Sequence, residues 1–225
     1  MSNKRPDYSG HVVHVMNRKV ERRTLFHSND GYNEFRSLLS AAIRKFDMRI
    51  LEWTLMPNHW HLLLWPEKKQ QLPECMKWLT SMHARLIRGR TETVGNGAIY
   101  QSRYRSSFVK PGIHLDRIRN YIAMNPVKAG LIDQSIDWIW GSAKRANFSH
   151  LNSNIPLSSG PEPHPNNLYQ LLSDPDYLDH SQRKLLSQSL HNELPYGNAA
   201  WIQDIGEEFN IPNTTKKVGR PRKRN

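Results

Sequence analysis

The sequence lacks the features of a secreted or a membrane protein. Cys75 is the one cysteine among 225 residues, which excludes a disulfide framework within the chain and a cysteine-based zinc finger. No stretch approaches the roughly 20 apolar residues that a membrane-spanning helix needs. The first ten residues, MSNKRPDYSG, lack the basic-then-apolar order of a secretory signal. We therefore expect a cytoplasmic protein that has no membrane partner.

Acidic residues are also scarce relative to basic ones. Thirty-two Lys and Arg stand against 20 Asp and Glu, which gives a formal net charge of +12 at pH 7. Such an excess indicates a polyanionic partner, because each cation that contacts a phosphate releases condensed counterions. A basic protein that is merely soluble, without such a partner, is the alternative. The charge alone favours a nucleic-acid-binding protein.

The apolar pattern predicts an α+β fold in the first 148 residues. The expected strands cover 11–17, 48–55, 59–65 and about 99–109, and the expected helices cover 30–46, 72–88 and about 112–124. The order β-α-β-β-α-β-α is typical of a ferredoxin-like antiparallel sheet with helices on one face. A tight connection at Met56-Pro57-Asn58 should join the second and third strands.

The composition changes beyond Phe148. Residues 149–166 are rich in Ser, Pro and Asn, which predicts a linker after a first domain at 1–148. Residues 167–210 show apolar positions typical of short helices, so we expect a small helical extension. Residues 211–225 form a basic tail that is too polar to fold alone.

His59 and His61 form a candidate metal site. Successive side chains of a strand alternate between its two faces, so these histidines share one face and Trp60 points to the other. Two imidazoles one residue apart can hold one metal ion between them. The chain has 11 histidines, so two unrelated surface histidines remain the alternative.

Tyr121 and Asn125 lie four residues apart on the last helix of the first domain. This spacing puts them on adjacent turns of one helix face. A phenol and an amide oxygen placed there could both approach a metal ion held by the two histidines. The alternative is that Tyr121 belongs to the core with Ile118 and Ile122.

Arg103, Tyr104 and Arg105 alternate cation and aromatic ring in the predicted last strand. This pattern suits neutralisation of a nucleic-acid backbone together with base stacking. A solvated edge strand with an ordinary tyrosine is the other interpretation.

The tail contains Gly219-Arg220-Pro221-Arg222-Lys223. An extended basic segment of this kind can enter the narrow minor groove of A·T-rich DNA. Short basic tails are also common as nonspecific phosphate binders. Both interpretations make Arg220, Arg222 and Lys223 candidate DNA-binding residues.

Two longer motifs resemble a known family. MPNHWHLLL (56–64) and RNYIAMNPVKAGL (119–131) are similar to the single-tyrosine HUH transposases of the IS200-like superfamily, and more narrowly to the REP-associated tyrosine transposases. Shorter similar segments are NRKVERRTLF (17–26), YQSRYRSS (100–107) and GRPRK (219–223). The resemblance covers about 8–148 and returns at 194–209.

The resemblance implies a single-stranded DNA endonuclease and strand transferase. Tyr121 would be the nucleophile, forming a 5′-phosphotyrosine and a free 3′-hydroxyl. His59, His61 and Asn125 would bind a divalent metal, and with phosphate oxygens in the site Mg²⁺ or Mn²⁺ is favoured over zinc. The implied substrate is hairpin DNA of repetitive extragenic palindromes, with Lys128 of the second motif as a further DNA contact, in a protein associated with the bacterial nucleoid.

Two other functions compete with this one. Another HUH enzyme, a replication initiator or a relaxase, would use the same histidines with a different tyrosine context and larger domains. A non-catalytic nucleic-acid-binding module could use a ferredoxin-like sheet, although the sequence has no aromatic-rich RNA-binding strand of the RRM type. Whether the protein is a monomer or a homodimer stays open on the sequence alone.

Overall fold

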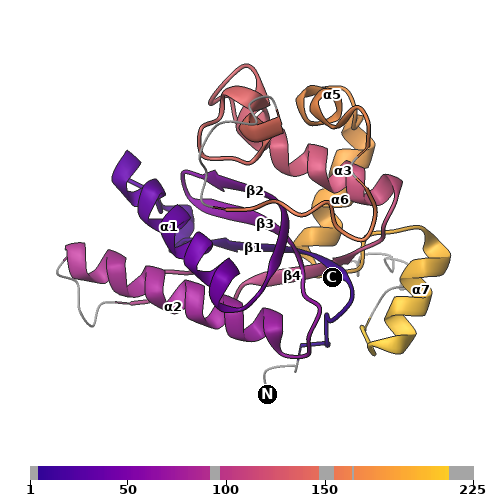
Figure 1. The fold of residues 1–225 in the computed structure, drawn as a ribbon, viewed down its shortest axis with the longest axis horizontal. Helices are drawn as coiled ribbons and strands as arrows, with labels where there is room; N and C mark the ends of the chain where they lie inside the picture. The colour runs from indigo at the N-terminus through magenta and orange to yellow at the C-terminus, as the bar shows by residue number, and fades with distance from the viewer. Residues whose placement is uncertain (1–4, 92–96, 147–154, 164, 213–225) are drawn as a thin grey trace, which may run out of the picture.

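The computed structural model of the chain describes residues 5–91, 97–146, 155–163 and 165–212. The helices and strands follow the order β-α-β-β-α-β (Figure 1) and then continue with helices only. The strands are β1 (Val12–Arg18), β2 (Arg49–Met56), β3 (His59–Trp65) and β4 (Arg105–Val109). The α-helices are α1 (Asn29–Lys45), α2 (Gln71–Thr91), α3 (Ile113–Ala123), α4 (Asn125–Lys128), α5 (Leu168–Ser173), α6 (His180–His191) and α7 (Ala199–Glu208). Short 3₁₀ turns lie at Val20–Arg22, Ser135–Asp137 and Ala143–Ala146.

The four strands form one antiparallel sheet in the order β2-β3-β1-β4. This order is that of a ferredoxin-like split βαβ, so the predicted α+β fold with an antiparallel sheet is confirmed. Pro57 and Asn58 make the tight connection between β2 and β3, since Met56 pairs directly with His59. The last strand is shorter than predicted. Of the residues before Arg105 that were expected in it, only Tyr100 makes a bridge, to Lys19.

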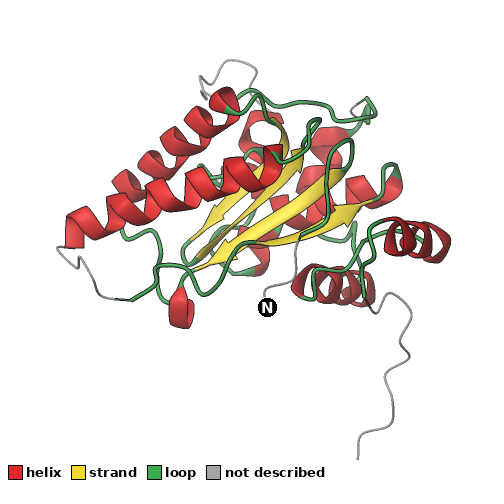
Figure 2. Cartoon of the chain, turned by 90° about the horizontal axis from the view of Figure 1, so that it is seen from below, coloured by secondary structure: helices red, strands yellow, loops and turns green. Residues whose placement is uncertain are grey.

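Helices α1 and α2 cover one face of the sheet, as Figure 2 shows. The side chains on this face belong to one large apolar cluster, which includes Trp60, Leu62 and Leu64 of β3. Phe35 from α1 and Met76 from α2 pack in the same cluster. Trp60 is completely buried there, as expected for the residue between two histidines that face the other way.

The opposite face is covered as well, by α3 and α6. Leu63 of β3 packs with Ile118 and Ile122 of α3 and with Leu186 and Leu190 of α6. The prediction of helices on one face is therefore right for α1 and α2 and wrong for α3. The reason is that the central strands are apolar on both faces, so both faces require a cover.

The described part of the predicted linker lies along the edge of the sheet. Ile155 is completely buried, Leu157 forms a parallel bridge with Ile50, and the Ser158 amide donates to the Ile50 carbonyl at 2.8 Å. Residues 155–163 are thus packed against the first domain. Residues 149–154 and 164 of the predicted linker and residues 213–225 of the predicted tail lie outside the described residues. In the part of the chain that the structure describes, no helix is long and apolar enough to cross a membrane.

Candidate active site

A cavity of about 360 Å³ opens on the α3 side of the sheet and contains all four residues predicted to carry the chemistry. His59 and His61 reach it from β3, Tyr121 from α3, and Asn125 from the start of α4. The basic residues that line it are Arg18, Arg22, Arg105 and Lys128. Because no Asp or Glu is among the described lining residues, the cavity is suited to a polyanion.

The two histidines lie close to each other and to the tyrosine. The His59 and His61 rings are 4.9 Å apart between centroids and nearly perpendicular, at 81°. The Tyr121 ring lies 5.9 Å from the His61 ring, edge to face at 89°. Tyr121 is only partly buried and also packs against the apolar cluster of Ile118 and Ile122. The tyrosine therefore joins the core by its ring and still lines the cavity.

The Asn125 side chain is hydrogen-bonded to the backbone of Tyr121. Its side-chain nitrogen donates to the Tyr121 carbonyl oxygen at 2.7 Å, which uses the four-residue spacing seen in the sequence. With the amide nitrogen engaged in this way, the side-chain oxygen is the group that Asn125 can offer to a cation. Asn125 itself begins the one-turn helix α4, which has Pro126 in its first turn. Since α3 ends at Ala123, Tyr121 and Asn125 lie on two successive helices and not on one helix as predicted.

Both candidate metal-binding imidazoles are oriented by a second polar group. Nδ1 of His61 lies 2.8 Å from Nε2 of His14, a buried residue of β1. Nδ1 of His59 lies 2.5 Å from the Asn58 side-chain oxygen. A metal-binding histidine commonly uses its other ring nitrogen in such a hydrogen bond. Because Nδ1 is engaged in each ring, Nε2 of His59 and of His61 is the nitrogen left to bind a cation.

Burial keeps these rings neutral at neutral pH. Loss of hydration lowers the pKa of His14 to about 3, with repulsion from His59 as a smaller cause. Loss of hydration likewise lowers the pKa of His59 to about 3, with repulsion from Arg18 as a smaller cause. Burial also lowers the pKa of His61 well below its usual value, with repulsion from His59, His14 and Arg18 added. A histidine must be neutral to bind a metal, so the electrostatics fit a metal site.

The site is not a closed structural metal centre. Among the residues that the structure describes, no group of three or more His, Cys, Asp and Glu is arranged to hold a metal ion. A cation bound by two imidazoles must complete its coordination with the Asn125 oxygen, water or substrate oxygens. That incomplete set of protein ligands is typical of catalytic sites, which keep positions open for substrate.

Arg103, Tyr104 and Arg105 do not form one continuous surface. Arg105 lines the active-site cavity and donates to the His191 carbonyl oxygen at 2.6 Å. Tyr104 is 8% exposed, and the Arg5 guanidinium lies 3.7 Å from its ring centre. That face of the Tyr104 ring is covered in this structure, so it offers no open platform for a base. Residues 220, 222 and 223, also predicted to bind DNA, lie outside the described residues.

A second, larger cavity of about 1200 Å³ carries Arg103 and Tyr104. It lies between the start of the chain, α2 and the segment before β4. Asp7 is the one acidic residue among its described lining residues. Seven basic residues line it: Arg5, Lys68, Lys69, Lys77, Arg85, Arg88 and Arg103. The excess of positive charge found in the sequence is thus concentrated partly in this cavity.

Several residues in or beside the site, among them His14, Arg18 and Arg183, were not identified from the sequence. His14 stands in the apolar segment HVVHVMN, where a histidine between valines on a strand is a signal for a buried polar contact. Arg18 lies four residues later on β1 and lines the cavity. Arg183 of α6 lies over the Tyr121 ring, with its Cζ 5.7 Å from the ring centre. No local pattern in the extension marks Arg183.

Comparison with protein families agrees with this geometry. Residues 7–125 match the family model described as "Transposase IS200 like". This segment is more than half of the chain, and it contains His59, His61, Tyr121 and Asn125. The protein therefore belongs to the IS200-like transposase family. Transposase activity implies binding, cleavage and transfer of DNA.

Two individual proteins to which this chain is similar are both described as REP-associated tyrosine transposases. A Haemophilus influenzae protein described as a REP-associated tyrosine transposase is 24% identical over 153 residues, which are 64% of this chain and 87% of that protein. A solved structure of a REP-associated tyrosine transposase bound to a REP hairpin covers 73% of this chain and all of its own, at a TM-score of 0.54 and 21% identity. That second likeness shows a shared fold.

Proposed function

We propose that this protein is a single-stranded DNA endonuclease and strand transferase that cleaves and rejoins hairpin DNA through Tyr121. One observation carries the proposal. The partly buried tyrosine of α3 stands edge to face with His61 at 5.9 Å between ring centroids, in a cavity lined by four Arg and Lys side chains. The proposed nucleophile, the two histidines proposed to bind the metal and a basic surface are thus in one place.

The chemistry transfers one phosphodiester bond to the protein and back. The Tyr121 oxygen attacks phosphorus, and the bond between phosphorus and the 3′ oxygen breaks. The phenol loses its proton and the 3′ oxygen gains one, which leaves a 5′-phosphotyrosine and a free 3′-hydroxyl. Because the new ester retains the energy of the old one, attack by a 3′-hydroxyl of another strand end rejoins DNA without ATP.

The reaction needs help from the surroundings because a phenol, with a pKa of about 10, is mostly protonated at neutral pH. His59, His61 and Asn125 would hold a divalent cation, Mg²⁺ or Mn²⁺, which acts as a Lewis acid on the phosphate oxygens. The hydrogen bonds that His61 makes with His14 and that His59 makes with the Asn58 side-chain oxygen hold the two imidazoles in place for that role. Arg18, Arg22, Arg105 and Lys128 add positive charge around the phosphate.

Hairpin DNA of the REP type is the proposed substrate. The support is the similarity to REP-associated tyrosine transposases, one of which has been solved with a REP hairpin. The second cavity, with its seven basic residues, provides a surface for the backbone of DNA that extends beyond the cleaved phosphate. The basic tail is proposed as an additional contact.

A cleavage assay separates this function from a non-catalytic nucleic-acid-binding module. The protein is incubated with a 5′- and 3′-labelled single-stranded REP hairpin and Mg²⁺, and the products are resolved under denaturing conditions. The proposal expects a cut strand with a free 3′-hydroxyl and a second fragment bound covalently to protein. A scrambled strand without the palindrome is the matched control. Tight hairpin binding with no cut product would instead support the binding module.

A further inference from the structure

Helix α6 of the C-terminal extension forms one wall of the active site. Leu186 and Leu190 lie one turn apart, are 0% and 3% exposed, and pack in one cluster with Ile118 and Ile122 of the tyrosine helix. At its start, Asp179 accepts from the Gln182 amide at 2.8 Å and the Gln182 side chain accepts from the Asp179 amide at 3.2 Å. This capping box fixes the first turn.

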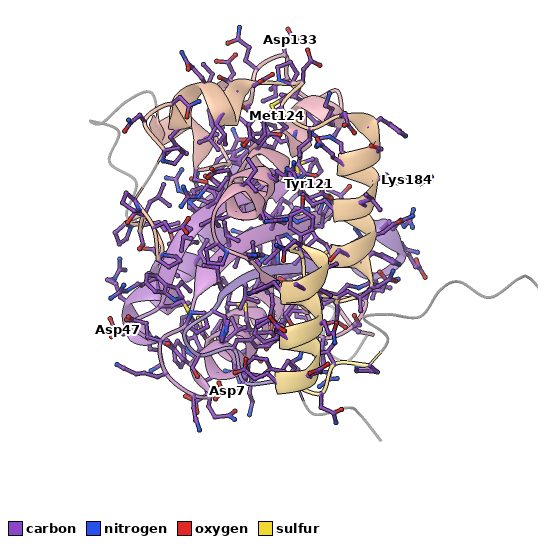
Figure 3. The ribbon with its side chains drawn as sticks, turned by 90° about the vertical axis from the view of Figure 1, so that its right-hand side faces the viewer. Asp7, Asp47, Tyr121, Met124, Asp133 and Lys184 are labelled. Carbon is purple, nitrogen blue, oxygen red and sulfur yellow. The ribbon has the colours of Figure 1, made fainter. Side chains whose placement is uncertain are left out.

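Helix α6 carries Arg183, Ser187 and Leu190 on the side that meets Tyr121 and the cavity. They follow the spacing i, i+4 and i+7, so they lie on one face of the helix. Ser187, Leu190 and the neighbouring His191 line the active-site cavity. Arg183 lies one turn earlier, with its Cζ 5.7 Å from the centre of the Tyr121 ring, within the range of a cation–π contact. Figure 3 shows Tyr121 beside this helix and Lys184 on its outer side.

Arg183 has an unused donor at this position. Its Nη2 is buried and has no hydrogen-bond partner among the described residues. Buried N–H groups of folded proteins nearly always have a partner, so one that lacks a partner calls for an explanation. A guanidinium keeps its charge even when burial lowers its pKa, as burial does for Arg183. An anion with oxygen acceptors next to Tyr121 would satisfy this donor.

We propose that Arg183 binds the non-bridging oxygens of the phosphate that Tyr121 attacks, and those of the resulting phosphotyrosine. The proposal rests on the proposed function of Tyr121 as the nucleophile. When the bond from the Tyr121 oxygen to phosphorus forms and the bond to the 3′ oxygen breaks, negative charge increases on the non-bridging oxygens. A guanidinium beside them stabilises that charge with charge-assisted hydrogen bonds. The extension is therefore part of the active site.

The test compares Arg183→Gln and Arg183→Lys with Lys184→Ala. Lys184 is the adjacent residue and is exposed, so its removal takes the same charge from the helix without touching the site. The rate of covalent adduct formation is measured in single turnover with the labelled hairpin. Hairpin affinity is measured by filter binding, and folding is checked by thermal unfolding. We expect Arg183→Gln to slow the reaction about 10²–10³-fold, as removal of an oxyanion donor does, while hairpin affinity and unfolding temperature change little.

Arg183→Lys should recover part of the rate, because an ammonium restores the charge without the planar fork. Lys184→Ala should react at the wild-type rate. Rejoining should slow by the same factor as cleavage in Arg183→Gln, because both steps pass through the same charged phosphate. An unchanged or faster reaction in Arg183→Gln would overturn this inference. If wild-type protein forms no adduct, the proposed function of Tyr121 fails instead, so the two failures are distinguishable.

Discussion

Nε2 of His14 lies 2.8 Å from Nδ1 of His61. The contact joins neighbouring strands, because Met16 of β1 pairs with His61 of β3 and His14, two residues away, is a diagonal neighbour on the same face. His14 is 1% exposed and cannot reach a bulk-solvent partner. It therefore holds the His61 ring in the orientation that presents Nε2 to the cavity.

Removal of the His14 imidazole should weaken metal binding. We expect His14→Phe to lower Mn²⁺ affinity about 10–100-fold, the usual cost of removing a group that orients a metal-binding histidine. Electron paramagnetic resonance of free Mn²⁺ measures the affinity without any DNA. His14→Gln, which keeps a polar atom at the end of the side chain, should retain more affinity than His14→Phe. The exposed His27 provides the control variant His27→Ala, and equal affinity in His14→Phe and His27→Ala would contradict the positioning role.

The two histidines proposed to bind the metal should be indispensable for cleavage. His59→Ala and His61→Ala each remove one of the two imidazoles proposed to bind the cation, so we expect hairpin cleavage to be lost in both. Excess EDTA should stop the wild-type reaction, and Mg²⁺ or Mn²⁺ should restore it. The readout is the labelled cut strand on a denaturing gel. Undiminished cleavage in excess EDTA would show that the reaction needs no divalent cation.

His83 makes stability depend on pH away from the active site. Its Nδ1 is hydrogen-bonded to the Tyr100 hydroxyl at 2.6 Å. Burial, with repulsion from Lys19 as a smaller cause, lowers the pKa of His83 from 6.5 to about 3. The unfolded chain therefore binds a proton between these values that the folded chain does not. This contribution to stability is complete above pH 6.5 and is lost as the pH falls toward 3.

At pH 5 the loss from His83 amounts to about 2 kcal/mol, given 1.36 kcal/mol per pKa unit. His83→Asn keeps an acceptor near the Tyr100 hydroxyl but has no titrating ring. The difference in unfolding free energy between pH 7 and pH 5, measured by urea denaturation, should be smaller in this variant by about that amount. Burial raises the pKa of Glu52 to about 7, so its contribution to stability has the opposite sign and is lost as the pH rises. Because Glu52 is present in both proteins, it does not affect the difference between them. An identical pH dependence in the two proteins would show that His83 is not held neutral.

The basic tail should contribute binding but no chemistry. Deleting residues 215–225 removes six positive charges at Lys216, Lys217, Arg220, Arg222, Lys223 and Arg224. For each phosphate that the tail neutralises, the deletion should flatten the slope of log affinity against log salt by about 0.7–0.9. Cleavage at saturating DNA should persist, because the residues proposed to be catalytic lie far earlier in the chain. Binding titrations at several salt concentrations measure the slope, and an unchanged slope would show that the tail does not touch DNA.

The local geometry of the site could be predicted from the sequence because it follows from periodicity. A period of two puts His59 and His61 on one strand face, and a spacing of four puts Tyr121 and Asn125 on adjacent helix turns. That the strand and the helix meet does not follow from either pattern. The expectation came from the resemblance of the two motifs to a family. The structure brings His61 and Tyr121 together across 60 positions of the chain.

His14, Arg183 and the placement of α3 could not be predicted in the same way. The partner of His14 is set by the register between β1 and β3, and a shift of one residue would put His14 on the other face. The position of Arg183 depends on α6 packing against α3 through Leu186 and Leu190. The short amphipathic segment itself does not specify that partner. Likewise, both faces of the sheet are apolar, so the sequence of α3 itself does not determine which face the helix covers.

The covalent adduct of Tyr121→Phe tests the central claim most directly. This substitution removes one oxygen and keeps the ring that packs against the cluster of Ile118 and Ile122, so folding and hairpin binding should be preserved. Wild-type protein and the variant are incubated with labelled hairpin and Mg²⁺, then separated by denaturing electrophoresis, and the adduct is mapped by mass spectrometry of its peptides. We predict an adduct on the peptide that contains Tyr121 in wild type and none in the variant. An adduct that persists in Tyr121→Phe, or that maps to Tyr100 or Tyr104, would contradict the assignment of Tyr121 as the nucleophile.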